Sequence, residues 1–290
     1  MSVTSRLWGK RVRASAAVAA IAMPLALMAG APAQAQVLFD VIGPQEYNLP
    51  VDFKPFNAFV QYGYVQNNSK AWNLNGDSVE GSGGQNVVGL SKYVRFWTPE
   101  FNRNIGLAFE VIQPEVSIRD RSMDNPHLSG FGDTITGFAG WYKPTPKSTL
   151  GIQSFVQIPW GDSDVSTGNW QNLTSILWYT PLVGPIDWTG DAGFNWQSAT
   201  PAGLNPALLW HTNQRFGWIV NDWIEPFVGF DYEYIGAFDG IPEAWAFDGG
   251  VGVMFATYPG QSFTVRYSKG LWGENHTHTN SLNLKYAYTW

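Results

Sequence analysis

The sequence predicts an all-β fold, a transmembrane antiparallel up-and-down β-barrel of about twelve strands. Three observations lead to this prediction. Charged residues make up only 14% of the chain and aromatic residues 16%, with 15 Trp among them. Beyond its first 35 residues, the chain has no apolar run long enough for a membrane-spanning helix. Instead, segments of about ten residues alternate between apolar and polar side chains, as the strands of a membrane barrel do.

The composition argues against several other classes of protein. The chain of 290 residues has a formal net charge of −6, whereas a nucleic-acid-binding protein would carry a basic surface. It has no Cys, which excludes a disulfide framework, a Cys-based metal site and a Cys nucleophile. Its aromatic content argues against disorder. A soluble periplasmic β-sandwich would have a similar composition, so the pattern along the chain must distinguish the two folds.

Residues 1–35 have the features of a secretory signal peptide that is cleaved after export. An apolar stretch from Ala14 to Met28 precedes Ala33-Gln34-Ala35, which fits the small-x-small cleavage pattern. The alternative, a transmembrane anchor, would need a longer apolar run. The basic residues before the stretch are Arg6, Lys10, Arg11 and Arg13. We therefore expect export, and with it localisation in the bacterial outer membrane.

Residues 36–55 form an N-terminal segment that precedes the first predicted strand. Among them are Phe39, Pro44, Pro50 and Phe53. This segment could fold into the barrel as a plug or stay in the periplasm, and the sequence leaves both arrangements open. The outer-membrane barrel itself is expected over residues 56–290.

The final segment of the chain shows the strand alternation most clearly. From Ser281 to Trp290, every second residue is a large apolar or aromatic one, and the residues between them are mostly polar. The same pattern appears along most of the chain, although the early segments alternate less cleanly and Lys92 falls on an apparent lipid face. The twelve predicted strands cover residues 56–66, 86–97, 105–115, 130–142, 149–159, 170–181, 186–197, 207–217, 223–234, 244–256, 261–272 and 281–290.

The connections between these segments alternate between short and long, which is typical of outer-membrane barrels. Short connections contain turn residues such as Tyr258-Pro259-Gly260. The longer connections are expected at 67–85, 116–129, 160–169, 198–206, 235–243 and 273–280. A β-sandwich has no reason to alternate in this way, so the pattern favours the barrel.

Aromatic residues concentrate at both ends of the predicted strands. Such residues mark the two membrane–water interfaces of a barrel, although ordinary core packing is the alternative. Those beside the short turns are Trp97, Trp141, Tyr142, Tyr179, Trp188, Trp218, Trp223, Phe255, Tyr258 and Trp290. Those beside the long loops are Trp160, Trp170, Trp196, Trp210, Tyr234, Trp245 and Trp272.

Three short motifs resemble a known family. Ser129-Gly130-Phe131-Gly132-Asp133 is followed by Ile158-Pro159-Trp160-Gly161-Asp162 and then by Thr167-Gly168-Asn169-Trp170. They are similar to motifs of the meta-pathway phenol-degradation outer-membrane proteins, which have a Gly-Asp strand, a Pro-Thr-Gly element and a Gly-rich approach to the next strand. Trp160 stands where that family usually has Thr. The resemblance, which could extend over most of residues 50–290, implies an outer-membrane barrel linked to uptake of small aromatic or hydrophobic compounds.

Strand faces also predict two charged walls inside the barrel. The basic wall comprises Arg95, Arg266 and Lys285. The acidic wall comprises Asp187, Asp191, Glu225, Asp231, Glu233 and Asp248, with Arg215 lying among these acids. Opposed walls would set up a transverse field that tunes selectivity. The alternative is an ion-pair network that fills the lumen.

Apolar residues predicted to face inward would give a path for an aromatic substrate, or would simply fill the lumen. These residues are Phe59, Tyr93, Phe155, Phe227 and Met254. No sequence motif supports catalysis. His211 is the one histidine expected to point inward, whereas His276 and His278 are expected in a solvated loop.

The sequence therefore predicts a channel for passive uptake of small hydrophobic or aromatic molecules, and not an enzyme. A non-transporting barrel closed by ion pairs and a soluble periplasmic β-sandwich binding protein are the alternatives. The expected partners are outer-membrane lipids and lipopolysaccharide, a small-molecule substrate, and the barrel-assembly machinery through the strand ending at Trp290. No nucleic acid, cofactor or metal is expected.

Overall fold

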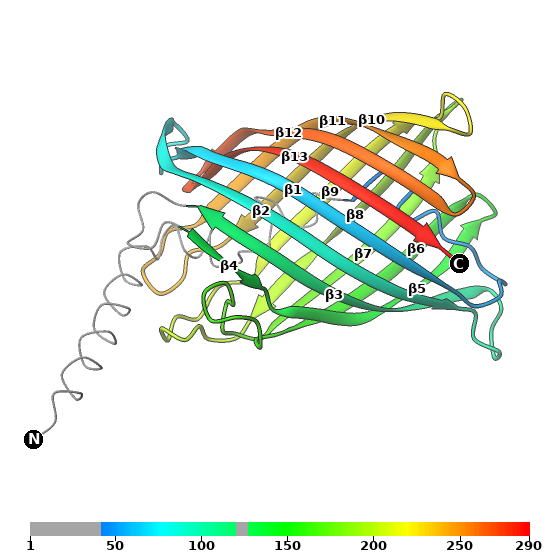
Figure 1. Cartoon of the computed structure of the whole chain (residues 1–290), viewed down its shortest axis with the longest axis horizontal. Helices are drawn as coiled ribbons and strands as arrows, with labels where there is room; N and C mark the ends of the chain where they lie inside the picture. Colours follow the sequence, from blue (N-terminus) through cyan, green and yellow to red (C-terminus); the bar gives the residue numbers. More distant parts are fainter. Residues whose placement is uncertain (1–41, 120–126) are drawn as a thin grey trace, which may run out of the picture.

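The computed structural model describes residues 42–119 and 127–290, which form one closed β-barrel (Figure 1). The strands are β1 (Phe56–Trp72), β2 (Ser78–Trp97), β3 (Ile105–Arg119), β4 (His127–Phe131), β5 (Thr134–Thr145), β6 (Ser148–Ile158), β7 (Gln171–Pro181), β8 (Ile186–Gln197), β9 (Leu209–Trp218), β10 (Ile224–Ile235), β11 (Ala244–Tyr258), β12 (Gln261–Glu274) and β13 (His276–Thr289). Residues 1–35 lie outside the described part. None of the described residues belongs to a helix long and apolar enough to cross a membrane.

The barrel has twelve strand positions, because β4 and β5 share one of them. Both pair with β3, β4 along Glu115–Arg119 and β5 along Ile105–Ile112. Every other strand pairs antiparallel with its neighbours in chain order, and β1 pairs with β13 to close the ring. The prediction of a twelve-stranded antiparallel barrel is thus confirmed, and the closed ring rules out a β-sandwich.

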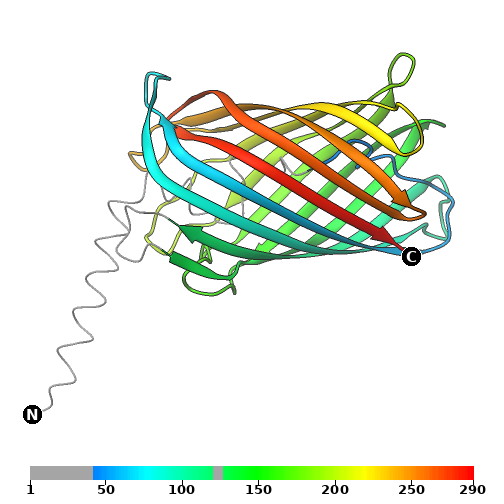
Figure 2. The same ribbon diagram turned by 45° about the horizontal axis from the view of Figure 1, so that its top comes forward.

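Ring closure explains how these residues can form strands in an apolar solvent. Within a bilayer every backbone N–H and C=O must find a protein partner, and a closed sheet has no unpaired edge. The strands are long and tilted, and they follow one another around the wall in both views (Figures 1 and 2). In β13, Leu282 and Leu284 are exposed on the outside, whereas Ser281 and Asn283 are buried inside.

Two of the predicted long loops are in fact tight hairpins. Only residues 73–77 connect β1 to β2, and Asn275 alone separates β12 from β13. Asn275 has a φ of 49°, a left-handed conformation that asparagine tolerates better than most residues. The predictions of loops at 67–85 and 273–280 are therefore wrong. At these ends of β1, β2, β12 and β13, polar residues continue the backbone pairing. The alternation of apolar side chains that predicts a membrane strand is absent there.

The inner face of the barrel is divided into an apolar half and a polar half. The apolar half comes mainly from β1–β3 and β5–β7 and includes Ala58, Val60, Val94, Ala108, Ile112, Ala139, Phe155, Leu173 and Leu177. The polar half comes mainly from β8–β12 and includes Asp187, Asp191, His211, Asn213, Arg215, Glu225, Asp231, Asp248 and Arg266. Alternation is weak in the early strands because their inner face is largely apolar and the outer face of β1 and β2 mixes apolar with polar residues, such as Asn57, Gln61 and Ser91.

This division overturns the inward placement of Arg95, Tyr93 and Phe59. In β2 the inner face carries Lys92 and Val94, so Arg95 and Tyr93 point outward. Phe59 pairs with Tyr93 on that outer face, where the two residues are 37% and 42% exposed. The assignment assumed that polar residues face the lumen. It fails here because most of this part of the lumen wall is apolar, and Lys92, predicted to face lipid, lies inside.

Residues 42–50 lie within the barrel and are called the inner segment. Ile42 and Tyr47 are buried against Leu177 and Tyr179 of β7. The chain then runs along the end of the barrel to β1, as the blue trace shows (Figure 1). Of the two arrangements that the sequence left open for residues 36–55, the part from residue 42 to residue 50 occupies the lumen. Residues 36–41 lie outside the described residues.

Candidate functional site

The inner segment is held to the polar half of the wall by contacts from β8, β9 and β10. Arg215 Nε donates to the carbonyl of Ile42 at 2.8 Å. Tyr47 OH donates to Asp191 Oδ2 at 2.8 Å. The side chain of Gln45 donates to Glu225, and its backbone N–H donates to Thr189 Oγ1 at 3.1 Å. These contacts satisfy polar groups that would otherwise be buried without partners.

A cavity of about 430 Å³ separates the inner segment from the apolar half of the wall. It is called the apolar cavity and is lined by Val60, Val94, Ala108, Ile112, Ala139, Trp141, Phe155, Leu173 and Met254, among others. Sites for small ligands are typically concave, mostly apolar, and about 300–1,000 Å³ in volume. A porin lumen, by contrast, is polar and filled with water. The size and lining of this cavity therefore suit a small apolar molecule.

Four charged side chains interrupt the apolar lining. Lys92 Nζ forms an ion pair with Glu110 Oε2 at 2.6 Å, and both belong to the wall. Lys285 forms an ion pair with Glu46 of the inner segment, and its ammonium lies 5.7 Å from the centre of the Tyr62 ring. Tyr62 OH donates to Glu46 Oε1 at 3.1 Å. The four charges cancel when the segment is in place.

The Glu46 carboxyl is ionised in this setting. Burial alone would raise its pKa, because the charged form loses its hydration. The ammonium groups of Lys285 and Lys92 outweigh that effect and hold the pKa of Glu46 below its usual range. The inner segment therefore carries a stable negative charge into the apolar cavity.

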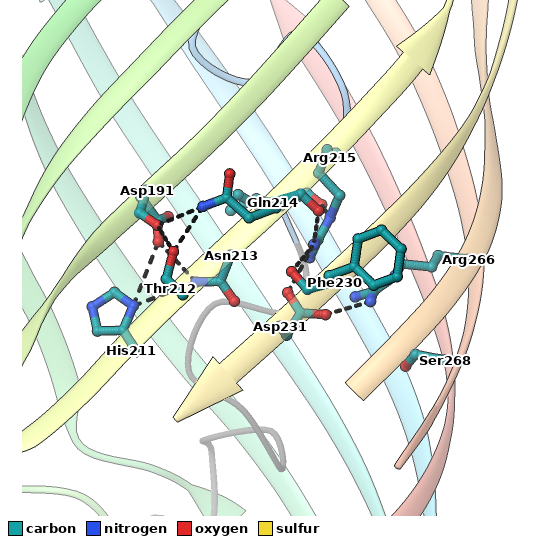
Figure 3. Close-up of polar contacts among 12 residues, drawn as sticks. Asp191, His211, Thr212, Asn213, Gln214, Arg215, Phe230, Asp231, Arg266 and Ser268 are labelled. Atoms are coloured by element: carbon teal, nitrogen blue, oxygen red, sulfur yellow. Dashed lines mark hydrogen bonds and ion pairs between the residues drawn. The ribbon is translucent and has the colours of Figure 1, made fainter. Parts of the chain in front are cut away.

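The polar half contains buried ion pairs and does not form an acidic wall opposite a basic one. Asp231 lies between two arginines, with Arg215 Nη1 at 2.7 Å from Oδ1 and Arg266 bound to Oδ2 (Figure 3). A second group centres on Asp191, whose Oδ1 accepts from Asn213 Nδ2 at 2.8 Å and lies 3.4 Å from His211 Nδ1.

Each member of the predicted acidic wall faces inward and is buried, but the predicted basic wall does not form. Arg95 points outward, Arg266 pairs with Asp231, and Lys285 pairs with Glu46. The acids Asp187, Asp191, Glu225, Asp231, Glu233 and Asp248 are all at most 8% exposed. The arrangement matches the alternative of an ion-pair network that the sequence left open. The sequence did not predict the Lys285–Glu46 pair, because Glu46 lies outside the strands from which the walls were inferred.

The residues of the predicted apolar path divide between the two faces of the barrel. Phe155 and Phe227 are 2% and 4% exposed on the inside, and Met254 lines the apolar cavity. Phe59 and Tyr93 are on the outside and cannot contribute. Two further aromatic residues expected at the membrane interfaces, Trp141 and Tyr179, instead face inward.

The histidines at the start of β13 also differ from expectation. His276 and His278 belong to a strand and not to a solvated loop, and both point inward. His276 Nε2 is 2.7 Å from Glu233 Oε1, and the His278 ring stacks on Trp72 at 4.4 Å between ring centres. No cluster of three or more His, Asp or Glu side chains that could hold a metal ion occurs among residues 42–119 and 127–290.

The loop between β6 and β7 folds into the opposite end of the barrel around one carboxylate. Asp133 accepts from the backbone N–H groups of Gly161 and Thr167 at 3.0 and 2.9 Å. The hydroxyl of Ser166 donates to it at 2.6 Å. Val165, only 2% exposed, packs in a cluster with Tyr64, Val88, Val116 and Ile118. The three motifs that resemble the known family, at residues 129–133, 158–162 and 167–170, thus lie together and fix this loop to the barrel.

Comparison with known proteins agrees with this geometry. A family model described as "Putative MetA-pathway of phenol degradation" matches residues 69–286. An outer-membrane channel from Pseudomonas putida F1 superposes with a TM-score of 0.74, at 16% identity over 86% of this chain and 100% of that chain. The β domain of the Bordetella autotransporter BrkA superposes with a TM-score of 0.50, at 10% identity over 82% and 100%. No curated protein matches the sequence.

Proposed function

The chain belongs to the family described as the putative MetA pathway of phenol degradation, and on this premise we propose that it is an outer-membrane channel for small hydrophobic or aromatic molecules. The apolar cavity inside the closed barrel carries the proposal, because a lumen serving only hydrophilic solutes would not have an apolar wall. Passage is passive. A molecule partitions into the cavity, passes the inner segment and diffuses out.

The outer surface supports a membrane location. Exposed aromatic residues gather at both ends of the strands, where a bilayer has its two interfaces. At the end with the C-terminus they include Trp218, Trp223, Tyr258 and Trp290, and at the other end Trp160, Trp170, Trp196, Trp210 and Trp272. Outer-membrane lipids and lipopolysaccharide are accordingly the proposed surroundings. The barrel-assembly machinery is the proposed partner of β13.

The cavity itself provides the test. Replacing Ala108, which is 1% exposed and lines the cavity, with Trp fills the space that a substrate would need. We expect cells making the Ala108→Trp variant to take up the apolar probe N-phenyl-1-naphthylamine severalfold more slowly than cells making the parent protein. Ala192 of β8 faces outward, so Ala192→Trp is the matched control and should not change uptake.

The comparison requires that each variant is folded in the cells. Heat-modifiable migration on a gel shows this for each variant. Uptake equal to that of cells without the protein would overturn the proposal, as would equal uptake by the Ala108→Trp and Ala192→Trp variants. The dense ion pairs of the polar half favour one second candidate, a structural barrel that transports nothing. That candidate predicts no uptake by any of the proteins.

A further inference from the structure

The charges around the apolar cavity are balanced only because the inner segment supplies one of them. Three of the four charged residues, Lys92, Glu110 and Lys285, belong to the barrel wall. Lys92 is paired with Glu110, so these two charges cancel. Without the inner segment, the wall of the cavity would carry one net positive charge, on Lys285. Glu46 of the inner segment neutralises it.

An ammonium in such a place needs an anionic partner. With the inner segment in place the Lys285 side chain is only 12% exposed, and a buried charge without an opposite charge beside it is strongly unfavourable. Tyr62 OH points at the same carboxylate and adds a hydrogen-bond donor. The wall therefore offers an ammonium, a phenolic hydroxyl and a broad apolar surface within one cavity.

From these groups we infer that the apolar cavity binds small apolar carboxylates, such as an aromatic monocarboxylate, and that Glu46 occupies the position of the ligand's carboxylate. The ligand carboxylate would replace Glu46 on Lys285 and Tyr62, with its ring against Val60, Val94 and Ala108. This inference rests on the proposed function, because the cavity is the same, and it adds the class of substrate and the event that releases the inner segment.

The exchange of one carboxylate for another keeps Lys285 paired throughout. Because Glu46 is tethered to the barrel, its carboxylate competes for Lys285 at an effective concentration on the order of millimolar. A ligand without a carboxylate can enter the apolar space but leaves the Lys285–Glu46 pair intact. An anionic ligand therefore competes with the inner segment, whereas a neutral ligand of the same shape does not.

Binding to the purified, detergent-solubilised protein tests the inference without any transport. Calorimetry would compare benzoate with benzyl alcohol, which is neutral and of similar shape. The Glu46→Gln variant removes the competing charge and keeps the side-chain shape. We expect it to bind benzoate roughly tenfold more tightly than the parent protein does, with no change for benzyl alcohol. Adding Lys285→Gln should abolish the gain.

Gln45→Ala is the matched control, since Gln45 also fixes the inner segment but carries no charge. If Gln45→Ala gives the same gain for benzoate, or if Glu46→Gln tightens binding of both ligands alike, the role of the charge is refuted. Absence of any gain in Glu46→Gln refutes it as well. These results do not depend on whether cells take up N-phenyl-1-naphthylamine, so the channel proposal and this inference can fail separately.

A second measurement needs no change at Glu46. The chain has no Cys, so Asn48→Cys in the exposed part of the inner segment gives a single site for a spin label. Benzoate should increase the mobility of this label in the parent background, and benzyl alcohol should not. A label that is equally immobile with and without saturating benzoate would contradict displacement of the segment.

Discussion

Asp133 shows how much one buried carboxylate can organise. Its two oxygens accept five hydrogen bonds, from Gly161, Ser166, Thr167 and Gln157, with both the backbone and the hydroxyl of Thr167 as donors. All but one of these donors belong to the loop that follows β6. The loop has no regular secondary structure. The Asp133 side chain, together with the bonds of Asp162 to Phe131 and Val165, therefore holds Val165 in the barrel.

Asp133→Asn keeps the shape of that side chain but replaces one acceptor oxygen with a donor. We expect the variant to lose about 1–3 kcal/mol of loop stability and to become sensitive to protease between β6 and β7. Asp164→Asn, in the exposed part of the same loop, is the control. Equal protease resistance of the two variants would show that Asp133 does not anchor the loop.

Glu46 makes the seating of the inner segment depend on pH in a defined direction. Its pKa lies below the ordinary value of 4.5, so its ion pair contributes fully above that pH and is lost as the pH falls through the lowered pKa. Lys285, Lys92, Tyr62 and Glu110 are the ionisable groups around it. A label at Asn48→Cys should stay immobile at pH 5 and become mobile only in stronger acid. Release at pH 6 would contradict this.

At the scale of elements, the inner segment differs from the strands because it pairs with none of them. Its contacts to the wall are made by side chains and by single backbone groups. Removing residues 42–50 should therefore leave the barrel folded, and should widen the lumen and increase single-channel conductance. A Gly-Ser linker of the same length in place of these residues preserves the connection to β1. Unchanged conductance would mean that the segment does not restrict the lumen.

The elements also show which predictions from sequence succeed. β10 and the part of β13 from Ser281 onward are polar inside and apolar outside, so their alternation predicted these strand segments and their faces correctly. β2 and β3 have apolar side chains on both faces, so alternation carried little information, and Lys92 and Arg95 were assigned to the wrong sides. The ion pair of Lys285 with Glu46 joins β13 to a segment without periodicity, and no local pattern could reveal it.

For the whole molecule, the polar half of the lumen acts as an internal support. Asp231 lies between Arg215 and Arg266, and these residues come from β9, β10 and β12. Removing the central charge leaves two guanidinium groups facing each other in a buried site. Asp231→Asn should therefore destabilise the barrel by about 3–5 kcal/mol.

The measurement for this prediction is the temperature at which the folded band on a gel converts to the unfolded one. Asp222→Asn, in the exposed turn between β9 and β10, is the control and should unfold at the temperature of the parent protein. If Asp231→Asn unfolds at that same temperature, the buried ion pairs are not needed for stability. The polar half would then merely fill space.

The seam between β1 and β13 has a consequence for biogenesis. There Asn57 and Trp290 exchange backbone hydrogen bonds, although they come from opposite ends of the barrel sequence. The backbone groups at the edges of β1 and β13 cannot pair until both strands exist. The unclosed sheet therefore keeps two edges with unpaired N–H and C=O groups until β13 has formed. Closure of the ring and pairing of these last backbone groups are accordingly a single step, and we expect the apolar outer surface to be prone to aggregation until that step is complete.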